Sequence, residues 1–318
     1  MILHSCAPVL LMIFNRPDTT RQVFERIRAT RPKQLFVAAD GPRADRSDET
    51  QLCAETRSII ERIDWPCKLN ILFREHNLGC KQAVSSAITW FFENVEEGII
   101  LEDDCLPEPS FFPFCTELLE RFRNNDQVLM VSGRNDLGTW KLNRYSYFFT
   151  IGNIWGWATW RRAWNKYDPE LKIWTDSTAQ NNMRLFGQRA PSLCKEIANG
   201  CEAVLQGKLD SWGYPWAFTR IAHRGIGVIP AMNLVSNIGF GKDATHTLSN
   251  DSPYVDIPLH RMQFPLRHNP DMRVDFNYYK QWHKVEQCHN AKPVPALSRV
   301  KNRLKSCYQR LWKLICRK

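Results

Sequence analysis

The chain has 318 residues, of which 43% are hydrophobic and 24% are charged, as in ordinary folded globular proteins. No apolar run approaches the roughly 20 residues that span a bilayer, so a membrane-spanning protein is not expected. The net charge of +10 comes mostly from residues 297–318, which hold eight Lys or Arg residues and no acid. The rest of the chain is nearly neutral, which argues against a general nucleic-acid-binding protein.

The N-terminal segment lacks the features of a secretion signal. Its apolar run has no basic leading segment and no small-residue cleavage site, and it continues directly into Asn15, Arg16 and Pro17. Eleven cysteines are scattered without a CxxC pair, and an odd number cannot all pair with one another. We therefore expect a cytoplasmic protein whose reduced thiols pack as small apolar side chains. Cys105 follows three acids that disfavour a thiolate, so it is not a candidate nucleophile.

Short apolar runs alternate with helical patterns in the first part of the chain. The runs predict strands at residues 8–14, 34–40, 68–74, 98–103 and 128–133. Three apolar faces at helical spacing predict helices between them: Val23, Phe24 and Ile27; then Ile59, Ile60 and Ile63; then Ala83, Val84, Ala87, Ile88 and Phe91. Repeated strand–helix units predict an α/β fold whose mainly parallel sheet is covered by helices on both faces.

Each predicted strand is followed by polar or charged side chains. These are Asn15 and Arg16, Asp40, Arg74 with His76, Glu102 to Asp104, and Asn135 with Asp136. Ligands bind beyond the carboxyl ends of the strands in sheets of this kind. The five polar strand ends therefore predict a binding site along one edge of the sheet.

The acid triplet Glu102, Asp103 and Asp104 is the most informative of these ends. Neighbouring carboxylates repel and resist burial unless a cation lies among them. Mg²⁺ or Mn²⁺, held by one or two carboxylates and a nucleotide diphosphate, would supply that cation. Adjacent strand residues point to opposite faces, so we expect Asp104 to bind metal and Glu102 or Asp103 to meet a ribose hydroxyl. The alternative is a solvated acidic turn, because short acidic runs are common.

Beyond residue 136 the strand pattern weakens and tryptophan becomes frequent. Four tryptophans fall within residues 153–168 alone. Tryptophans usually belong to the core, but Trp155 and Trp157 flank Gly156 in an apparent loop, where a sugar ring could stack on an aromatic face. Residues 247–296 are rich in proline and histidine and are predicted to be irregular.

The last segment, residues 297–318, predicts an amphipathic helix with a basic face. Two interpretations stay open for it. It is suited to lie on an anionic membrane, which would place the protein peripherally on the inner face of the cell membrane. Alternatively, it packs on the domain or on a partner chain.

Taken in order, several motifs resemble GT-A-fold glycosyltransferases related to N-acetylglucosaminyltransferase I and similar bacterial sugar transferases. Their metal-binding segment is similar to IILEDDCLPEPSFFPFCTELLERF, and their other segments are similar to PVLLMIFNRP, LFVAADGPR, VSGRNDLG, NIWGWATWRRAW, DSWGYPWAF and NLVSNIGFGKDATHT. The resemblance covers roughly residues 8–247. It implies one GT-A domain with a nucleotide-sugar-binding half (1–135) and an acceptor-side half (136–265), followed by an extension (266–318) that ends in the basic helix.

The resemblance also implies roles for individual residues. Arg16 would contact the nucleotide and Asp40 the uracil. Independently of the resemblance, a cation among His76, Asn77 and Lys81 would suit the diphosphate, which makes Lys81 the candidate; the alternative is a loop at the start of a helix. Asp104 would bind the metal. His246 would be a further metal ligand or a diphosphate contact, although a lone histidine is more often structural.

The acceptor side is expected to hold Trp155, Trp157 and Trp212. The related enzymes have an acid pair before a tryptophan, and here Ser211 replaces the second acid, so Asp210 would act as the base from one position earlier. The alternative for Asp210 is an N-cap of the tryptophan-rich helix that follows it. The missing second acid leaves the stereochemistry open, with inversion favoured over retention.

These features predict a glycosyltransferase dependent on Mn²⁺ or Mg²⁺. It would move a hexosyl or N-acetylhexosaminyl group from a UDP-sugar to a hydroxyl of a glycan or lipid-linked glycan, in bacterial surface polysaccharide synthesis. A sugar nucleotidyltransferase is one alternative, but it would carry a glycine-rich loop where this chain reads NRPDTTRQ. A non-catalytic carbohydrate-binding protein would not require the acid triplet, and a nuclease would require a basic groove.

Overall fold

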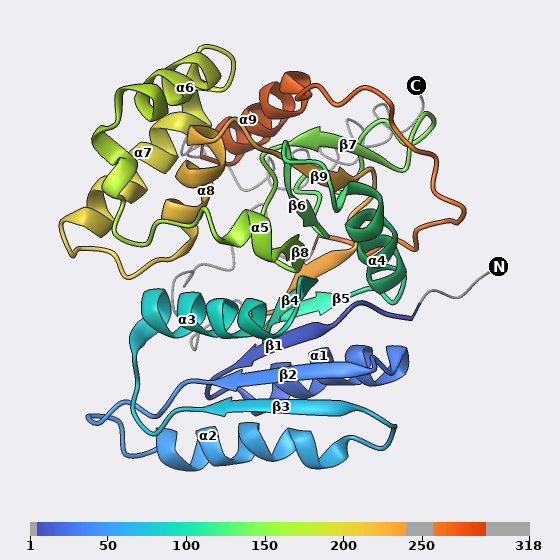
Figure 1. The fold of residues 1–318 in the computed structure, drawn as a ribbon, viewed down its shortest axis with the longest axis vertical. Coiled ribbons are helices and arrows are strands. Elements are labelled where there is room, and N and C mark those ends of the chain that lie inside the picture. Colours follow the sequence, from blue (N-terminus) through green and yellow to red (C-terminus); the bar gives the residue numbers. More distant parts are fainter. Residues whose placement is uncertain (1–4, 240–256, 291–318) are drawn as a thin grey trace, which may run out of the picture.

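The computed structural model of the chain describes residues 5–239 and 257–290. Eight strands form one mixed sheet in the order β3-β2-β1-β4-β8-β6-β9-β7, and β5 and β10 form a separate two-stranded ribbon (Figure 1). The predicted basic helix at residues 297–318 lies outside the described residues. Among the described residues, no helix has both the length and the apolar character that crossing a bilayer requires.

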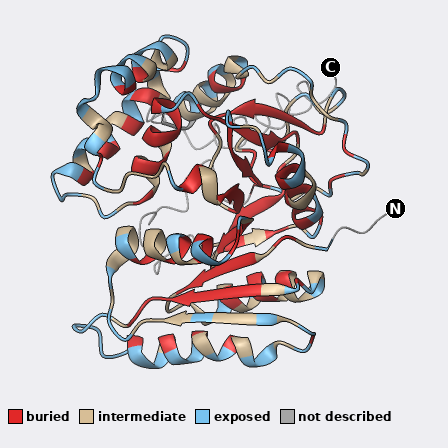
Figure 2. Cartoon of the chain, viewed as in Figure 1, coloured by how far each residue is buried: buried red, intermediate tan, exposed pale blue. Residues whose placement is uncertain are grey.

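The first four strands form the parallel half of the sheet. They are β1 (Val9–Ile13), β2 (Gln34–Ala39), β3 (Lys68–Phe73) and β4 (Glu97–Glu102). All pairings among them are parallel, and β1 lies between β2 and β4. β1 is buried on both faces and therefore reads as a continuous apolar run, whereas β3 is a partly exposed edge strand (Figure 2). The predicted α/β class and these four strands are confirmed.

The helices of this half follow the strands in the predicted order. They are α1 (Pro17–Thr30), α2 (Glu49–Arg57), α3 (Gly79–Asn94) and α4 (Phe111–Phe122). One detail of the prediction is wrong: Ile59 and Ile60 lie in the 3₁₀ turn η1 (Ser58–Arg62) that follows α2. Two adjacent β-branched residues disfavour continuation of an α-helix.

The second half of the sheet is mostly antiparallel. It contains β6 (Val128–Ser132), β7 (Tyr147–Thr150), β8 (Trp157–Trp160) and β9 (Ile226–Pro230). β8 runs antiparallel to both β4 and β6, and joins the two halves. The segment around Trp157 was predicted to be a loop. It is instead a central strand followed by the short helix α5 (Arg161–Trp164), and because both of its faces are buried it shows no polar alternation.

Helices η2 (Lys172–Thr175), α6 (Ser177–Gly187), α7 (Pro191–Leu205) and α8 (Gly213–Ala222) gather beside this half (Figure 1). The irregular structure predicted for residues 247–296 is wrong for α9 (Phe276–Asn290). Tyr278 and Tyr279 of α9 are buried against the ring of Phe148 and the ring of Phe186. These tertiary contacts stabilise a helix whose own sequence is only weakly amphipathic.

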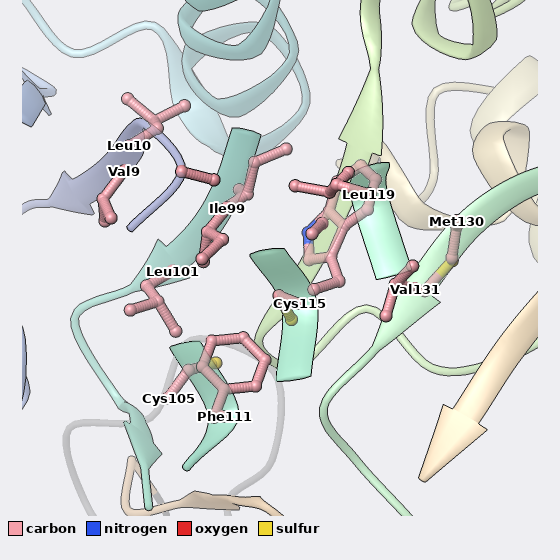
Figure 3. Close-up of a cluster of buried hydrophobic side chains, with 14 of the residues drawn as sticks. Val9, Leu10, Ile99, Leu101, Cys105, Phe111, Cys115, Leu119, Met130 and Val131 are labelled. Atoms are coloured by element: carbon pink, nitrogen blue, oxygen red, sulfur yellow. The ribbon is translucent and has the colours of Figure 1, made fainter. Parts of the chain in front are cut away.

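The main core joins β1, β4, α4 and β6. Figure 3 shows side chains from these elements meeting around Phe111 and Leu119. Cys105 and Cys115 belong to this core, and the cysteines of the described residues are free thiols. Burial raises the pKa of the Cys105 thiol well above its usual value. This agrees with a packing role for Cys105.

The ribbon brings a distant segment to the acid triplet. β5 (Cys105–Pro107) pairs antiparallel with β10 (Val235–Asn237). The N–H of Ile238 donates to the carbonyl oxygen of Asp104 at 2.8 Å. The chain just after β10 therefore passes directly over Asp104.

Candidate active site

A cavity of about 460 Å³ opens at the carboxyl ends of β1, β2 and β4. We call it the acid cavity. Eight of the strand-end or candidate site residues singled out in the sequence line it: Arg16, Asp40, Arg74, Glu102, Asp103, Asp104, Trp155 and Asp210. The prediction that the polar strand ends meet at one edge is confirmed for Arg16, Asp40, Arg74 and the acid triplet. The individual roles of all eight residues stay predictions.

Arg16 is the cation that lies among the acids. It follows β1 and directly precedes α1, and its guanidinium points back across the end of the sheet. Its Nη1 donates to Asp104 Oδ2 at 3.0 Å, and its Nε and Nη2 donate to the two oxygens of Asp103. Burial alone would lower the pKa of Arg16, but the two carboxylates raise it above the usual value. Arg16 therefore stays charged and holds both aspartates in place.

Glu102 has no such partner. Its side chain makes no hydrogen bond to the part of the chain that the structure describes, and it faces the acid cavity. Burial, together with the charges of Asp104 and Asp103, raises the pKa of Glu102 to about 8. Arg16 thus pairs with only two of the three carboxyl groups, and the triplet has an excess of negative charge when ionised.

This excess bears on the predicted metal. Within residues 5–239 and 257–290, no three His, Cys, Asp or Glu side chains come together as a complete metal site. Mg²⁺ and Mn²⁺, however, are often held by one or two carboxylates and by the phosphate oxygens of a substrate. Glu102 and Asp104 fit an ion shared with a diphosphate, but not one held by the protein alone. His246, the other predicted ligand, lies outside the described residues.

Gly239 explains how the chain approaches so closely here. A Cβ atom at this position would lie 2.3 Å from Asp104 Oδ2 and 2.7 Å from Arg16 Nη1. Only glycine leaves room for the ion pair beneath the backbone. Gly239 and Asn237 line the acid cavity, and sequence reasoning missed both, although they lie within the NLVSNIGFGKDATHT motif.

Asp40 is placed as predicted but is already heavily hydrogen-bonded. Its Oδ1 accepts the N–H groups of Gly41 and Leu78 at 3.0 Å, and its Oδ2 accepts from Asn77 Nδ2 at 2.9 Å and from the Leu78 N–H at 3.1 Å. Burial raises the pKa of Asp40, and these donors partly offset the effect. Asp40 therefore fastens the loop before α3 to the end of β2, and a uracil N–H would have to compete with these donors.

Asp210 lies at the N-terminus of α3. Its Oδ2 accepts the N–H of Cys80 at 2.5 Å, and its Oδ1 accepts the N–H of Lys81 at 3.0 Å. The close approach requires Gly79, whose φ is +79° and whose hypothetical Cβ would lie 2.7 Å from Oδ2. The predicted alternative, an N-cap of the helix that follows Asp210, is wrong: α8 has no side-chain cap, and Asp210 instead accepts from the first N–H groups of α3. Each carboxylate oxygen keeps a second lone pair for another donor.

Three predicted residues are not part of the acid cavity. Lys81 pairs with Glu170, its Nζ lying 3.2 Å from Oε1. Trp157 and Trp212 are 1% and 3% exposed, and their rings stack on each other with centroids 5.8 Å apart. Their acceptor-side role does not fit this position, because both rings are packed within the core and cannot meet a sugar. Half-buried Trp155 does line the acid cavity.

A second cavity of about 310 Å³ shares Trp155 with the acid cavity. We call it the aromatic cavity, after Trp155, Tyr214 and Trp282 in its wall. Asp210 lines the acid cavity, and its neighbour Ser211 lines the aromatic cavity. The two cavities are therefore linked both by a common side chain and by consecutive residues of the chain.

The strand end at Asp136, which the sequence placed with the others, lies at the aromatic cavity instead. Asp136 Oδ1 accepts from Arg134 Nε at 2.7 Å, and the Arg134 guanidinium lies 4.3 Å from the centroid of the Trp155 ring. This pair supports the shared wall from the side of the aromatic cavity.

Comparisons with known proteins give distant structural likenesses. No family model and no curated protein matches the chain. Among solved structures, apo UDP-glucose pyrophosphorylase is 10% identical over 72% of this chain and 93% of that chain, with a TM-score of 0.37. Apo mouse xyloside xylosyltransferase 1 is 11% identical, covering 68% and 81%, with a TM-score of 0.32. HddC from Yersinia pseudotuberculosis is 10% identical, covering 54% and 84%, with a TM-score of 0.32.

Proposed function

We propose that the protein is a glycosyltransferase that moves a sugar from a UDP-sugar to a hydroxyl group of a glycan. The nucleotide sugar would lie in the acid cavity and the acceptor in the aromatic cavity. The observation that carries this proposal is the junction of the two cavities: Trp155 lines both, and Asp210 and Ser211 line one each. A transferase needs two binding sites that meet where the bond is exchanged.

On the donor side, the triplet would receive the diphosphate through Mn²⁺ or Mg²⁺. When bound, the ion would offset the negative charge of the departing diphosphate. Asp104 and Glu102 are the ligands that the described residues offer, with His246 as the ligand implied by the family resemblance. Arg16 would keep Asp103 and Asp104 oriented, and Asp103 is the acid of the triplet that remains to meet a ribose hydroxyl.

On the acceptor side, Asp210 would take the proton of the attacking hydroxyl. The two N–H groups at the start of α3 donate to its carboxylate and hold it in a fixed orientation. A base at the junction of the cavities allows direct attack on the anomeric carbon and hence inversion. Trp155 would present its ring to a sugar at the same junction.

The two alternatives from the sequence fit less well. A sugar nucleotidyltransferase needs a flexible phosphate loop after its first strand, but here α1 begins at Pro17, four residues after the end of β1. A carbohydrate-binding protein built on tryptophans needs exposed rings, but Trp157, Trp160, Trp212 and Trp216 are buried. The proposal also keeps the expected acceptor, a surface polysaccharide or lipid-linked glycan, and the anionic membrane for residues 297–318.

Calorimetric titration with UDP tests this proposal directly. We expect micromolar binding in the presence of Mn²⁺ and its loss in EDTA, followed by sugar transfer when UDP-sugars and glycans are screened. Release of pyrophosphate from UTP and a sugar 1-phosphate would favour the nucleotidyltransferase. Binding of glycans without any binding of UDP would favour the carbohydrate-binding protein.

A further inference from the structure

The aromatic cavity contains a buried cation without a carboxylate partner. Arg220 lies on α8, is 2% exposed and lines this cavity. Its Nη1 donates to the carbonyl oxygens of Ile151 and Gly152 and contacts the sulfur of Met130, and its Nε lies 3.4 Å from the Trp216 carbonyl. No Asp or Glu of the described residues forms an ion pair with it. Glu196 also lines the cavity, but it does not pair with Arg220, and burial raises the pKa of Glu196 to about 7.

Arg134, in the same cavity, has the acidic counter-ion that Arg220 lacks. It is equally buried, at 1% exposure, but it has Asp136 as a counter-ion. Placing a charge in the protein interior is costly unless an opposite charge or several hydrogen bonds offset the lost hydration. Carbonyl dipoles provide only part of this for Arg220, whose Nη2 makes no hydrogen bond to any described residue. Burial lowers the pKa of Arg220 to about 10, so it is still charged at neutral pH.

The surroundings of Arg220 have the character of a sugar site. Tyr214 and Trp282 supply aromatic surface, and the cavity volume of about 310 Å³ has room for a sugar unit. The floor is formed by Ile229 and Tyr279, both less than a tenth exposed, so a ligand that reaches Arg220 would be largely removed from water. In such surroundings an ion pair with a guanidinium is strong and selective.

We propose that the aromatic cavity binds a sugar unit that carries a negative charge, either a carboxylate or a phosphate, and that Arg220 is its counter-ion. This inference rests on the proposed function and adds the chemical class of the acceptor. Arg220 also braces the chain at Ile151 and Gly152 through their carbonyl oxygens. It is therefore both part of the cavity floor and a contact for the ligand.

The experiment measures binding of three small probes to the full chain by calorimetry, without UDP or metal. The probes are glucuronic acid, glucose 6-phosphate and glucose. We expect at least one charged probe to bind about tenfold or more tightly than glucose, since one buried charged contact contributes more than 1.4 kcal/mol, and to weaken in high salt. A preference for glucuronic acid would identify a sugar acid, and a preference for glucose 6-phosphate a phosphorylated sugar. Equal binding of all three probes would overturn the inference.

Variants locate the site. Arg220→Met should abolish the preference for the charged probe. In case this variant does not fold, Ala217→Leu, one turn earlier on α8 and also in the cavity wall, should block binding by filling the space while Arg220 is retained. Arg144→Gln is the matched control, because Arg144 is an exposed arginine outside this cavity, and it should leave binding unchanged. Charged-probe binding that survives both cavity variants would overturn the inference.

The proposed function can fail separately from this inference. Loss of UDP binding in the presence of Mn²⁺, with the charged probe still bound, would contradict the donor site alone. The reverse result, with UDP bound and no preference for a charged probe, would contradict the assignment of Arg220 alone.

Discussion

The acid cavity and the aromatic cavity differ in the charged group that each leaves without an oppositely charged partner. In the acid cavity, Arg16 pairs with Asp103 and Asp104, and Glu102 has no cationic partner among the described residues. In the aromatic cavity, Arg134 has Asp136, and Arg220 has no acidic partner among the described residues. Unbalanced buried charge destabilises a fold. The unpaired groups have opposite signs, a carboxyl group at Glu102 in one cavity and a guanidinium at Arg220 in the other, and each is best explained if it meets a ligand group of the complementary sign.

The two cavities also differ in how they are built. The acid cavity is made mainly of residues that follow parallel strands, so the topology of the sheet brings them together. The aromatic cavity is made mainly of side chains from the segment before β8 and from α7, α8 and α9, with Arg134, Asp136 and Ile229 from the sheet side. Its composition depends on how helices distant in sequence pack against the sheet.

The largest expected effect is the loss of transfer in Asp104→Ala. Removing this carboxylate takes away the best placed metal ligand, and we expect turnover to fall by about 10³-fold or more, a size comparable to removing a main electrostatic stabiliser of a transition state. Steady-state assays with a UDP-sugar and Mn²⁺ measure this, with circular dichroism as the check on folding. Asp64→Ala, which removes an exposed partner of Arg28, is the control and should leave turnover unchanged. Substantial turnover in Asp104→Ala would contradict the metal assignment.

Asp210→Asn tests the junction of the two cavities. The amide cannot accept the proton of the acceptor hydroxyl, so we expect kcat to fall by about 10²–10⁴-fold. Binding of UDP should stay within about twofold of the original, and stability should fall by about 1 kcal/mol because an N-cap at α3 is weakened. Single-turnover kinetics and calorimetry separate the two quantities. Equal loss of UDP binding and turnover would show that Asp210 acts only by supporting α3.

Two tryptophan variants separate core from ligand contact. Trp157→Ala should lower the free energy of unfolding by about 3–5 kcal/mol, because it leaves a large cavity in the core. Half-buried Trp155→Ala should cost much less stability and should instead raise the KM for the acceptor. Urea unfolding and acceptor titrations measure the two effects. A Trp155 variant as unstable as the Trp157 variant would place Trp155 with the core.

The smallest expected effect is a change in pH dependence in Glu102→Gln. Because the pKa of folded Glu102 is raised from 4.5 to about 8, ionisation of this group costs more in the folded than in the unfolded chain. Its contribution to stability is therefore present below pH 4.5 and is lost as the pH rises towards 8. The glutamine variant should unfold like the original protein near pH 4 and be more stable at pH 8 by about 1–3 kcal/mol. Denaturant unfolding at both pH values measures this, and a less stable variant at pH 8 would show that ionised Glu102 has a cationic partner.

Some of the site was predictable from the sequence because it depends on local order. The apolar run of β4 ends at the acid triplet, and the run of β1 ends near Arg16, so parallel neighbours had to bring them together. Asp40 was placed correctly for the same reason. Its four hydrogen bonds were not predicted, because their donors include Asn77 and Leu78 on another loop.

Other features had no local signal. β8 is buried on both faces, so its tryptophans do not alternate with polar residues, and Trp157 and Trp212 could not be distinguished from Trp155 by sequence. The bonds from α3 to Asp210 join residues 130 and 129 positions apart. The sequence places Asp210 just before α8. Only the path of the chain between residues 81 and 210 brings its carboxylate to the start of α3 instead.

By itself, the sequence determined the parallel half of the sheet and the edge where its charged side chains meet, because residue periodicity and strand order decide both. Only the tertiary structure decided that Arg16 neutralises part of the triplet and that the Asp210 carboxylate lies at the N-terminus of α3. It alone revealed that Trp155 stands between two cavities and that Arg220 is buried without a counter-ion. Packing between distant segments determines which side chains become neighbours and which of them are shielded from water. The neighbours and the shielding together decide whether a buried charge is paired or unpaired.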